Sequence, residues 1–306
     1  MKFLQISKRV LLFLGVNALI MVTISMVMHF TGLNRGMSGG RYQSLMIFCL
    51  VWGMGGAFIS LAMSRLMAKW FMGVKLIDPA TNESGLRDVV EMVHTLARKA
   101  NLPELPQVGY FESNDVNAFA TGPTKSRSLV AVSTGLLRSM NRREVEGVLA
   151  HEVAHIANGD MVTMTLIQGI INAFVMFFAR ILASIVSSAL RSRDSRDGGG
   201  GMMHWLLIMA FEFVFSLLGA VVVCWFSRWR EFRADAGGAA LSTRANMADA
   251  LRALQRVHQP QLASAQAGQS AAFQSMMISG KSKGLMQLLS THPPLEERIA
   301  RLEAGR

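Results

Sequence analysis

The chain has 306 residues, of which 51% are hydrophobic and 17% are charged, and its mean hydropathy is +0.32. This composition is too apolar for an ordinary soluble enzyme and indicates a membrane protein. The net charge of +11 does not indicate nucleic-acid binding, because many basic residues flank apolar runs, as topology signals and lipid-headgroup contacts do. The two cysteines, Cys49 and Cys224, lie inside apolar runs, which argues against a structural disulfide and a cysteine-rich zinc cluster.

Two long apolar runs open the chain, at residues 10–30 and 44–63. Each is long enough to cross a bilayer as a helix. The first could be a signal peptide, but its core is long and no small-x-small cleavage site follows, so we predict an uncleaved membrane helix. Basic residues before the first run and after the second, including Arg65 and Lys69, place the N-terminus and the segment after the second run in the cytoplasm.

Residues 70–160 have the pattern of a soluble segment. Apolar residues at helical spacing predict an amphipathic helix over 83–100. Short runs over 107–111 and 128–132 predict strands, with a third candidate strand at 117–120 between them.

A long helix carrying the motif H-E-x-x-H follows. Asn141 is its expected N-cap, and Glu144 completes a capping box. His151 and His155 are four residues apart, so a helix places both imidazoles on one face, where they can share a zinc ion. Glu152 could then act as general base toward water. The alternative interpretation is an amphipathic helix with two ordinary surface histidines.

Two further apolar runs, at 161–190 and 202–227, form a second hairpin, and both are long enough to span. Each run contains one charged residue, Arg180 or Glu212. Either these two residues pair across the hairpin, or Arg180 extends to the far interface of the membrane. In a third arrangement the hairpin enters the membrane only partly.

Residues from 228 onward have a soluble pattern again, and four spans would return them to the side of the histidine helix. We expect a helix over 243–257 that is broken by Pro260, and then a mobile connection over 261–284. A short terminal helix is expected over 294–302.

A zinc ion held by two histidines needs another protein ligand. Glu231 and Asp235 are four residues apart, so on a helix both face one way. We assign Glu231 to the metal and Asp235 to the free N–H of His151, although a solvated helix face is the alternative. His292 is either a loop residue or a stabiliser of the oxyanion on an attacked carbonyl, and Arg298 has a similar or a structural role.

These motifs together resemble the HtpX family of bacterial membrane metalloproteases, which is related to the CAAX prenyl proteases. The two N-terminal spans fit as well, so the resemblance covers nearly the whole chain. The matching stretches are H-E-x-x-H at 151–155, E-F-R-A-D at 231–235, T-H-P-P-L-E-E-R-I at 291–299, N-A-F-A-T-G at 117–122 and S-T-G-L-L at 133–137.

The resemblance implies an integral inner-membrane zinc endopeptidase with a cytoplasmic catalytic domain. It further implies a role in the quality control of damaged or misfolded membrane proteins. The expected partners are membrane-protein substrates, the lipid bilayer and other membrane quality-control proteases. One Zn²⁺ per subunit is then held by His151, His155 and Glu231, with Glu152 as general base.

The predicted fold is α+β and mostly α, with about four transmembrane helices and a cytoplasmic zincin-like catalytic domain that contains a small β-sheet. Asn158 and Asp235 are expected to contact the metal-ligating side chains without binding the metal themselves. The expected divisions are an N-terminal transmembrane hairpin at 1–69, the first part of the catalytic domain at 70–160, a second transmembrane hairpin at 161–227 and the second part of the catalytic domain at 228–306.

In the peptide hydrolysis that the resemblance implies, Glu152 takes a proton from the attacking water and delivers it to the leaving amine. Extended substrate would pair with an edge strand formed by Asn117, Ala118, Phe119 and Ala120, unless that segment is an ordinary loop.

Two other functions remain open. A prenyl-protein processing peptidase would need a large membrane chamber, and four spans are too few to build one. A non-catalytic membrane scaffold or transporter with a vestigial metal site fits poorly with an intact set of ligands and base.

Overall fold

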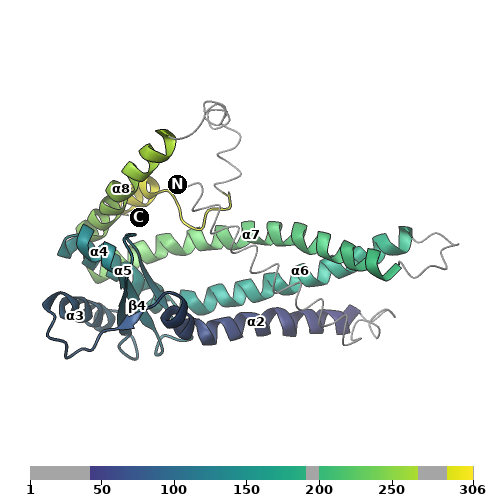
Figure 1. The fold of residues 1–306 in the computed structure, drawn as a ribbon, viewed down its shortest axis with the longest axis horizontal. Coiled ribbons are helices and arrows are strands. Elements are labelled where there is room, and N and C mark those ends of the chain that lie inside the picture. The colour runs from purple at the N-terminus through teal and green to yellow at the C-terminus, as the bar shows by residue number, and fades with distance from the viewer. Residues whose placement is uncertain (1–41, 191–199, 268–287, 306) are drawn as a thin grey trace. The chain divides into compact units, whose positions relative to one another are not determined.

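The computed structural model of the protein describes residues 42–190, 200–267 and 288–305. The predicted span at 10–30 and most of the predicted connection at 261–284 lie outside these residues. In chain order (Figure 1), the elements are α2 (Tyr42–Phe71), β1 (Lys75–Leu76), α3 (Ser84–Lys99), β2 (Gln107–Phe111), β3 (Ala118–Thr121), β4 (Leu129–Ser133), α4 (Thr134–Ser139), α5 (Arg142–Asn158), α6 (Asp160–Leu190), α7 (Gly200–Leu241), α8 (Arg244–Ala267) and α11 (Leu295–Glu303).

The chain divides into two compact units. The first contains Ile59–Met164 and the described residues from Phe226 onward, and therefore the sheet and the H-E-x-x-H helix. The second contains the described residues up to Phe58 together with Thr165–Trp225, which belong to the apolar helices.

A four-stranded mixed sheet with the order β1-β2-β4-β3 lies in the first unit. β2 and β4 are parallel, with Gln107 opposite Leu129 and Phe111 opposite Ser133, while β1 and β3 run antiparallel to their neighbours. Every residue of β4 is buried, as expected for a strand with partners on both sides and a sequence of Leu-Val-Ala-Val-Ser. β3 therefore forms one edge of the sheet.

The local sequence signals in this unit predicted the elements closely. The helix expected over 83–100 is α3, and the expected strands are β2, β3 and β4 with shifts of at most one residue at their ends. The terminal helix expected over 294–302 is α11. The strand β1 was missed because its two residues are too few for a periodic pattern, and its pairing with β2 defines it.

The core of the first unit lies between the sheet and the helices α3 and α5. From α3 it receives Val89, Val93 and Leu96, which are spaced on one helical face. Leu149 and Val153 of α5 belong to the same cluster. Burial of this many side chains fixes the position of the helix that carries both histidines.

Three helices of the described chain are long and apolar enough to cross a membrane: Ser44–Phe71, Asp160–Leu190 and Gly201–Leu241. In the second unit these helices expose large apolar side chains, among them Phe174 and Phe213, which suits contact with lipid. The last span is longer than expected, because α7 continues without a break from the predicted run at 202–227 to Leu241.

Arg180 and Glu212 pair inside the second unit. Nη1 of Arg180 lies 2.9 Å from Oε1 of Glu212 and also donates to the carbonyl of Met176 at 2.9 Å. Both charged residues are buried, with exposures of 5% and 3%. This confirms the predicted pair, and the alternative in which Arg180 extends to the far interface is wrong.

The prediction that Pro260 breaks its helix is wrong, since α8 runs from Arg244 to Ala267. Proline removes one backbone N–H from the helical ladder, but it does not abolish the other hydrogen bonds. The residues on both sides, such as Gln259, Leu262 and Ala263, are helix formers and allow the helix to continue.

Candidate metal centre

The helix α5 holds His151 and His155 in a fixed orientation. The predicted capping box is present at its N-terminus, where Asn141 Oδ1 accepts hydrogen bonds from two backbone N–H groups and Glu144 Oε2 accepts one from the Asn141 N–H at 2.9 Å. Gly159, at φ 70°, ends the helix in the left-handed conformation that glycine adopts without strain. The two histidine Nε2 atoms lie 3.1 Å apart.

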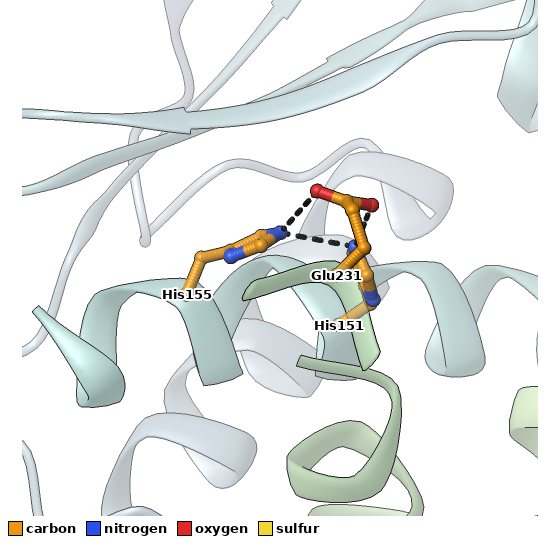
Figure 2. A group of neighbouring side chains, drawn as sticks. All are labelled: His151, His155 and Glu231. Atoms are coloured by element: carbon orange, nitrogen blue, oxygen red, sulfur yellow. Dashed lines mark hydrogen bonds and ion pairs between the residues drawn. The ribbon is translucent and has the colours of Figure 1, made fainter. Parts of the chain in front are cut away.

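Glu231 of α7 brings a carboxylate to the two imidazoles, as Figure 2 shows. Its Oε2 lies 3.4 Å from Nε2 of His151, and its Oε1 lies 3.4 Å from Nε2 of His155. The histidines are 8% exposed and Glu231 is 1% exposed. The three side chains offer ligand atoms that lie within 4.8 Å of one another and could hold a metal ion.

Two glycines of α7 permit its close approach to α5. A Cβ atom at Gly238 would lie 3.0 Å from the backbone nitrogen of His151, and one at Gly237 would lie 2.9 Å from Cβ of Ala154. Both separations are too short for a larger residue without movement of a helix. These glycines therefore set the distance at which Glu231 meets the histidines.

Each histidine is oriented by a carboxylate on its other ring nitrogen. Nδ1 of His151 lies 2.9 Å from Oδ1 of Asp235, and Nδ1 of His155 lies 2.6 Å from Oδ2 of Asp160. A carboxylate at Nδ1 fixes the tautomer in which Nε2 carries a lone pair. The lone pairs of both Nε2 atoms are therefore available to bind a cation beside Glu231.

The structure places the predicted Asp235 beside His151, and it adds Asp160, which was not predicted from the sequence. A supporting role is predicted for Asn158, whose side-chain nitrogen is buried and makes no hydrogen bond to any described residue. The missed signal is the Gly159-Asp160 pair directly after the helix. A left-handed glycine turns the chain back, so the next side chain can reach the preceding turn.

The C-terminal segment supplies two more groups. Nδ1 of His292 lies 2.9 Å from Oε2 of Glu231, and the side chain of His292 is 53% exposed. Arg298 of α11 is buried and donates to both oxygens of Asp235, from Nε at 2.7 Å and from Nη2 at 2.6 Å. His292 thus lies at the open side of the site, while Arg298 fixes the carboxylate that orients His151.

The charges of the site favour a cation between the histidines. Burial by itself lowers the pKa of His151, but the contacts with Asp235 and Glu231 outweigh it and raise the pKa to about 9. Burial also lowers the pKa of His155, whereas Asp160 and Glu231 raise it, and the charge of Glu152 adds to the rise. Glu152 itself follows His151 on α5 and is partly buried.

The separations suit side chains that share one metal ion. The two imidazole nitrogens lie 3.1 Å apart, and each lies 3.4 Å from a different oxygen of Glu231, so His151, His155 and Glu231 would hold the ion between them. The two Glu231 oxygens are buried and accept no well-angled hydrogen bond from a described residue, although His292 Nδ1 lies 2.9 Å and Arg298 Nη1 lies 3.4 Å from Oε2. Buried carboxylate lone pairs that accept no hydrogen bond suit a metal ion.

The predicted edge segment lies beside this helix. Asn117 is bonded to β4 through Ser133, and Ala118, Phe119 and Ala120 belong to the edge strand β3. β3 packs against α5, with Ala118 and Ala120 on the core that contains Val153. The alternative that this segment is an ordinary loop is wrong.

Comparison with known proteins identifies the family. Residues 84–306 match Peptidase family M48. The Protease HtpX homolog of Chlorobium phaeobacteroides is 47% identical over 98% of this chain and 100% of its own length. The Protease HtpX of Idiomarina loihiensis is 48% identical, again over 98% of this chain and 100% of its own length. These matches confirm the resemblance to HtpX.

A solved structure shares the fold. The crystal structure of S. mikatae Ste24p superposes with a TM-score of 0.60 at 15% sequence identity, covering 95% of this chain and 67% of that chain. The chain belongs to peptidase family M48 and is a membrane metalloprotease.

Proposed function

We propose that the protein is a zinc-dependent endopeptidase of the bacterial inner membrane, which cleaves damaged or misfolded membrane proteins in protein quality control. The observation that carries the zinc assignment is the set of distances among two imidazole nitrogens and one carboxylate, at 3.1, 3.4 and 3.4 Å. Two histidines and a glutamate form a common ligand set of catalytic zinc, with a further position left for water.

In this proposal His151, His155 and Glu231 hold one zinc ion per subunit. Asp235 and Asp160 accept the Nδ1–H bonds of the two histidines, which fixes the rings and raises their basicity as ligands. Asn158 has a supporting role at the end of the same helix.

Zinc, when bound, acts as a Lewis acid and lowers the pKa of a water molecule to about 7. Glu152, which follows His151 directly, would take a proton from the water that attacks the peptide carbonyl and would pass it to the leaving amine. His292, at the open side of the site, donates a hydrogen bond to the oxygen of the attacked carbonyl.

The substrate binds as an added strand on β3. Asn117 bonds to Ser133 of β4, so the alternation of an antiparallel pair directs the backbone groups of Phe119 toward β4 and those of Ala118 and Ala120 toward the outer edge, where an extended peptide could pair with them. Since β3 packs against α5, a peptide on this edge would pass near the H-E-x-x-H helix.

Membrane-protein substrates are favoured because site residues lie on the apolar helices themselves. Glu231 and Asp235 belong to the span Gly201–Leu241, and Asp160 begins the span Asp160–Leu190. Basic residues at the same end of α7, Arg228 and Arg230, support a cytoplasmic active site. Lipids and other membrane quality-control proteases are the expected partners.

Cleavage of a detergent-solubilised, destabilised membrane protein tests this function. Wild-type protein with zinc should cleave it, whereas added chelator or the change Glu152→Gln should abolish cleavage, and Glu152→Gln should retain zinc. Cleavage restricted to prenylated peptides would point to a processing peptidase. Absence of both zinc and activity after gentle purification and zinc addition would point to a non-catalytic scaffold.

A further inference from the structure

One face of α7 contacts the C-terminal segment 288–298 at three successive points. Arg228, Glu231 and Asp235 have the spacing i, i+3 and i+7, which places them in one row along a helix. Glu231 and Asp235 belong to the metal centre. Arg228 lies one turn before Glu231, and in the sequence it is one of the basic residues that flank the apolar run 202–227.

Arg228 binds the backbone just before His292. Its Nη1 donates to the carbonyl of Ser290 at 2.7 Å and to the carbonyl of Leu288 at 3.0 Å. Hydrogen bonds from a charged donor are roughly twice as strong as those between neutral groups. A guanidinium that faces two carbonyls of one short segment therefore holds that backbone against α7.

The residues on either side of His292 also restrain its backbone. The hydroxyl of Ser290, whose carbonyl binds Arg228, donates to the carbonyl of His292 at 2.7 Å. After His292 come Pro293 and Pro294, which have fixed φ angles and leave the chain little freedom before α11 begins. The backbone of His292 is thus restrained on both sides.

The downstream end of the segment is attached to the same face of α7. Arg298 binds Asp235 through two hydrogen bonds, and α11 packs with Leu295, Ile299 and Leu302 on the cluster that contains Met247 and Leu251. Arg228 supplies the corresponding attachment at the upstream end. Without it, residues 288–290 would lose their two hydrogen bonds to the guanidinium on α7.

We propose that Arg228 is a positioning residue of the metalloprotease site: it holds residues 288–290 on α7 so that the imidazole of His292 remains beside Glu231. This inference rests on the proposed function of His292 in peptide cleavage. Arg233, on the same helix, provides the contrast. Its guanidinium lies over the ring of Trp229 at 4.9 Å and is solvent-exposed, so it resembles an ordinary interfacial arginine.

The test combines kinetics with backbone hydrogen exchange on the full-length protein in detergent. Arg228→Gln should lower kcat by about 10- to 100-fold with little change in KM, as expected when a group that acts in the transition state is displaced. Arg228→Lys, which keeps a charged donor, should recover most of the loss. In the background His292→Ala, the change Arg228→Gln should cause little further loss.

Hydrogen exchange provides a readout independent of activity. The amides of residues 290–292 should exchange faster in Arg228→Gln than in wild type, while the matched variant Arg233→Gln should match wild type in exchange and in kcat. Unchanged exchange in Arg228→Gln, full additivity with His292→Ala, or an equal effect of Arg233→Gln would overturn the proposal.

Two further outcomes are distinguishable. Should Arg228→Gln fail to accumulate in folded form, Arg228→Met, which keeps an unbranched side chain but removes the donor, decides the question: faster exchange confined to residues 290–292 supports the restraint, and wild-type exchange and kcat contradict it. Absence of cleavage that depends on Glu152 in wild-type protein would refute the proposed function instead, whereas the exchange comparison would still report on the restraint.

Discussion

Arg298 and Asp235 form a two-point ion pair, with Nε and Nη2 of the guanidinium at 2.7 and 2.6 Å from the two carboxylate oxygens. Asp235 in turn lies 2.9 Å from Nδ1 of His151. The orientation of His151 therefore depends on α11, an element far from it in sequence.

The first prediction concerns this ion pair. Arg298→Lys replaces a planar donor of two parallel hydrogen bonds by a single ammonium, so Asp235 loses its fixed orientation. We expect about tenfold weaker zinc binding, measured by competition with a chromophoric chelator. Arg301→Lys is the control, because Arg301 pairs with the exposed Glu297 on the surface of the same helix. Equal zinc affinity of Arg298→Lys and wild type would show that the ion pair has no role in the site.

The second prediction concerns the carboxylate that the sequence analysis missed. Asp160→Ala removes the partner of His155 Nδ1, and we expect zinc affinity or activity to fall by about 10- to 100-fold. The change also leaves the buried Nδ1 of His155 without its partner, which should cost about 1–3 kcal/mol of stability. Asp88→Ala, at a half-buried residue whose Oδ2 lies 3.8 Å from Nη1 of Arg142, should leave both properties unchanged. Wild-type zinc affinity in Asp160→Ala would show that Asp160 does not support zinc binding through His155.

The third prediction concerns the contact between α5 and α7. Gly238→Val places a side chain against the backbone of His151, so α7 must move away and carry Glu231 with it. We expect reduced zinc content together with a lower midpoint of thermal unfolding. Gly85→Ala in α3 is the matched control, since a Cβ atom there meets no neighbour and alanine favours the helix. Full zinc loading of Gly238→Val would contradict the role given to this close approach.

The fourth prediction concerns the ion pair in the second unit. Arg180→Leu removes the charged partner of buried Glu212 and should destabilise the protein by about 3–5 kcal/mol. The double variant Arg180→Leu, Glu212→Leu should regain much of that loss, because no charge is then left in the apolar interior. Unfolding in mixed micelles with increasing denaturing detergent measures both. Additive losses in the double variant would show that the two charges act separately.

Local sequence signals predicted much of this molecule. The Asn141 capping box, the spacing of His151 and His155, and the apolar periodicity of α3 each depend on neighbouring residues, and each has the expected structure. Pairing of Arg180 with Glu212 was also predicted, because a charge in an apolar run has few partners.

Features that depend on tertiary contacts were harder to predict. Asp160 meets His155 only because Gly159 turns the chain back, and β1 exists only through its pairing with β2. Arg228 has the same flanking pattern as Arg230, yet the structure gives it two carbonyl partners in the segment before His292. Sequence spacing contains no information on such distant backbone partners.

The central claim is that two histidines and one glutamate hold a zinc ion, and zinc K-edge X-ray absorption of the purified, active protein tests it most directly. The account predicts one zinc per chain with only nitrogen and oxygen ligands at about 2.0–2.1 Å, and a scattering pattern of two imidazoles. In Glu231→Gln the occupancy should fall while the imidazole pattern of any residual zinc persists. A zinc site with sulfur ligands, with fewer than two imidazoles, or with full occupancy and an unchanged spectrum in Glu231→Gln would contradict the account.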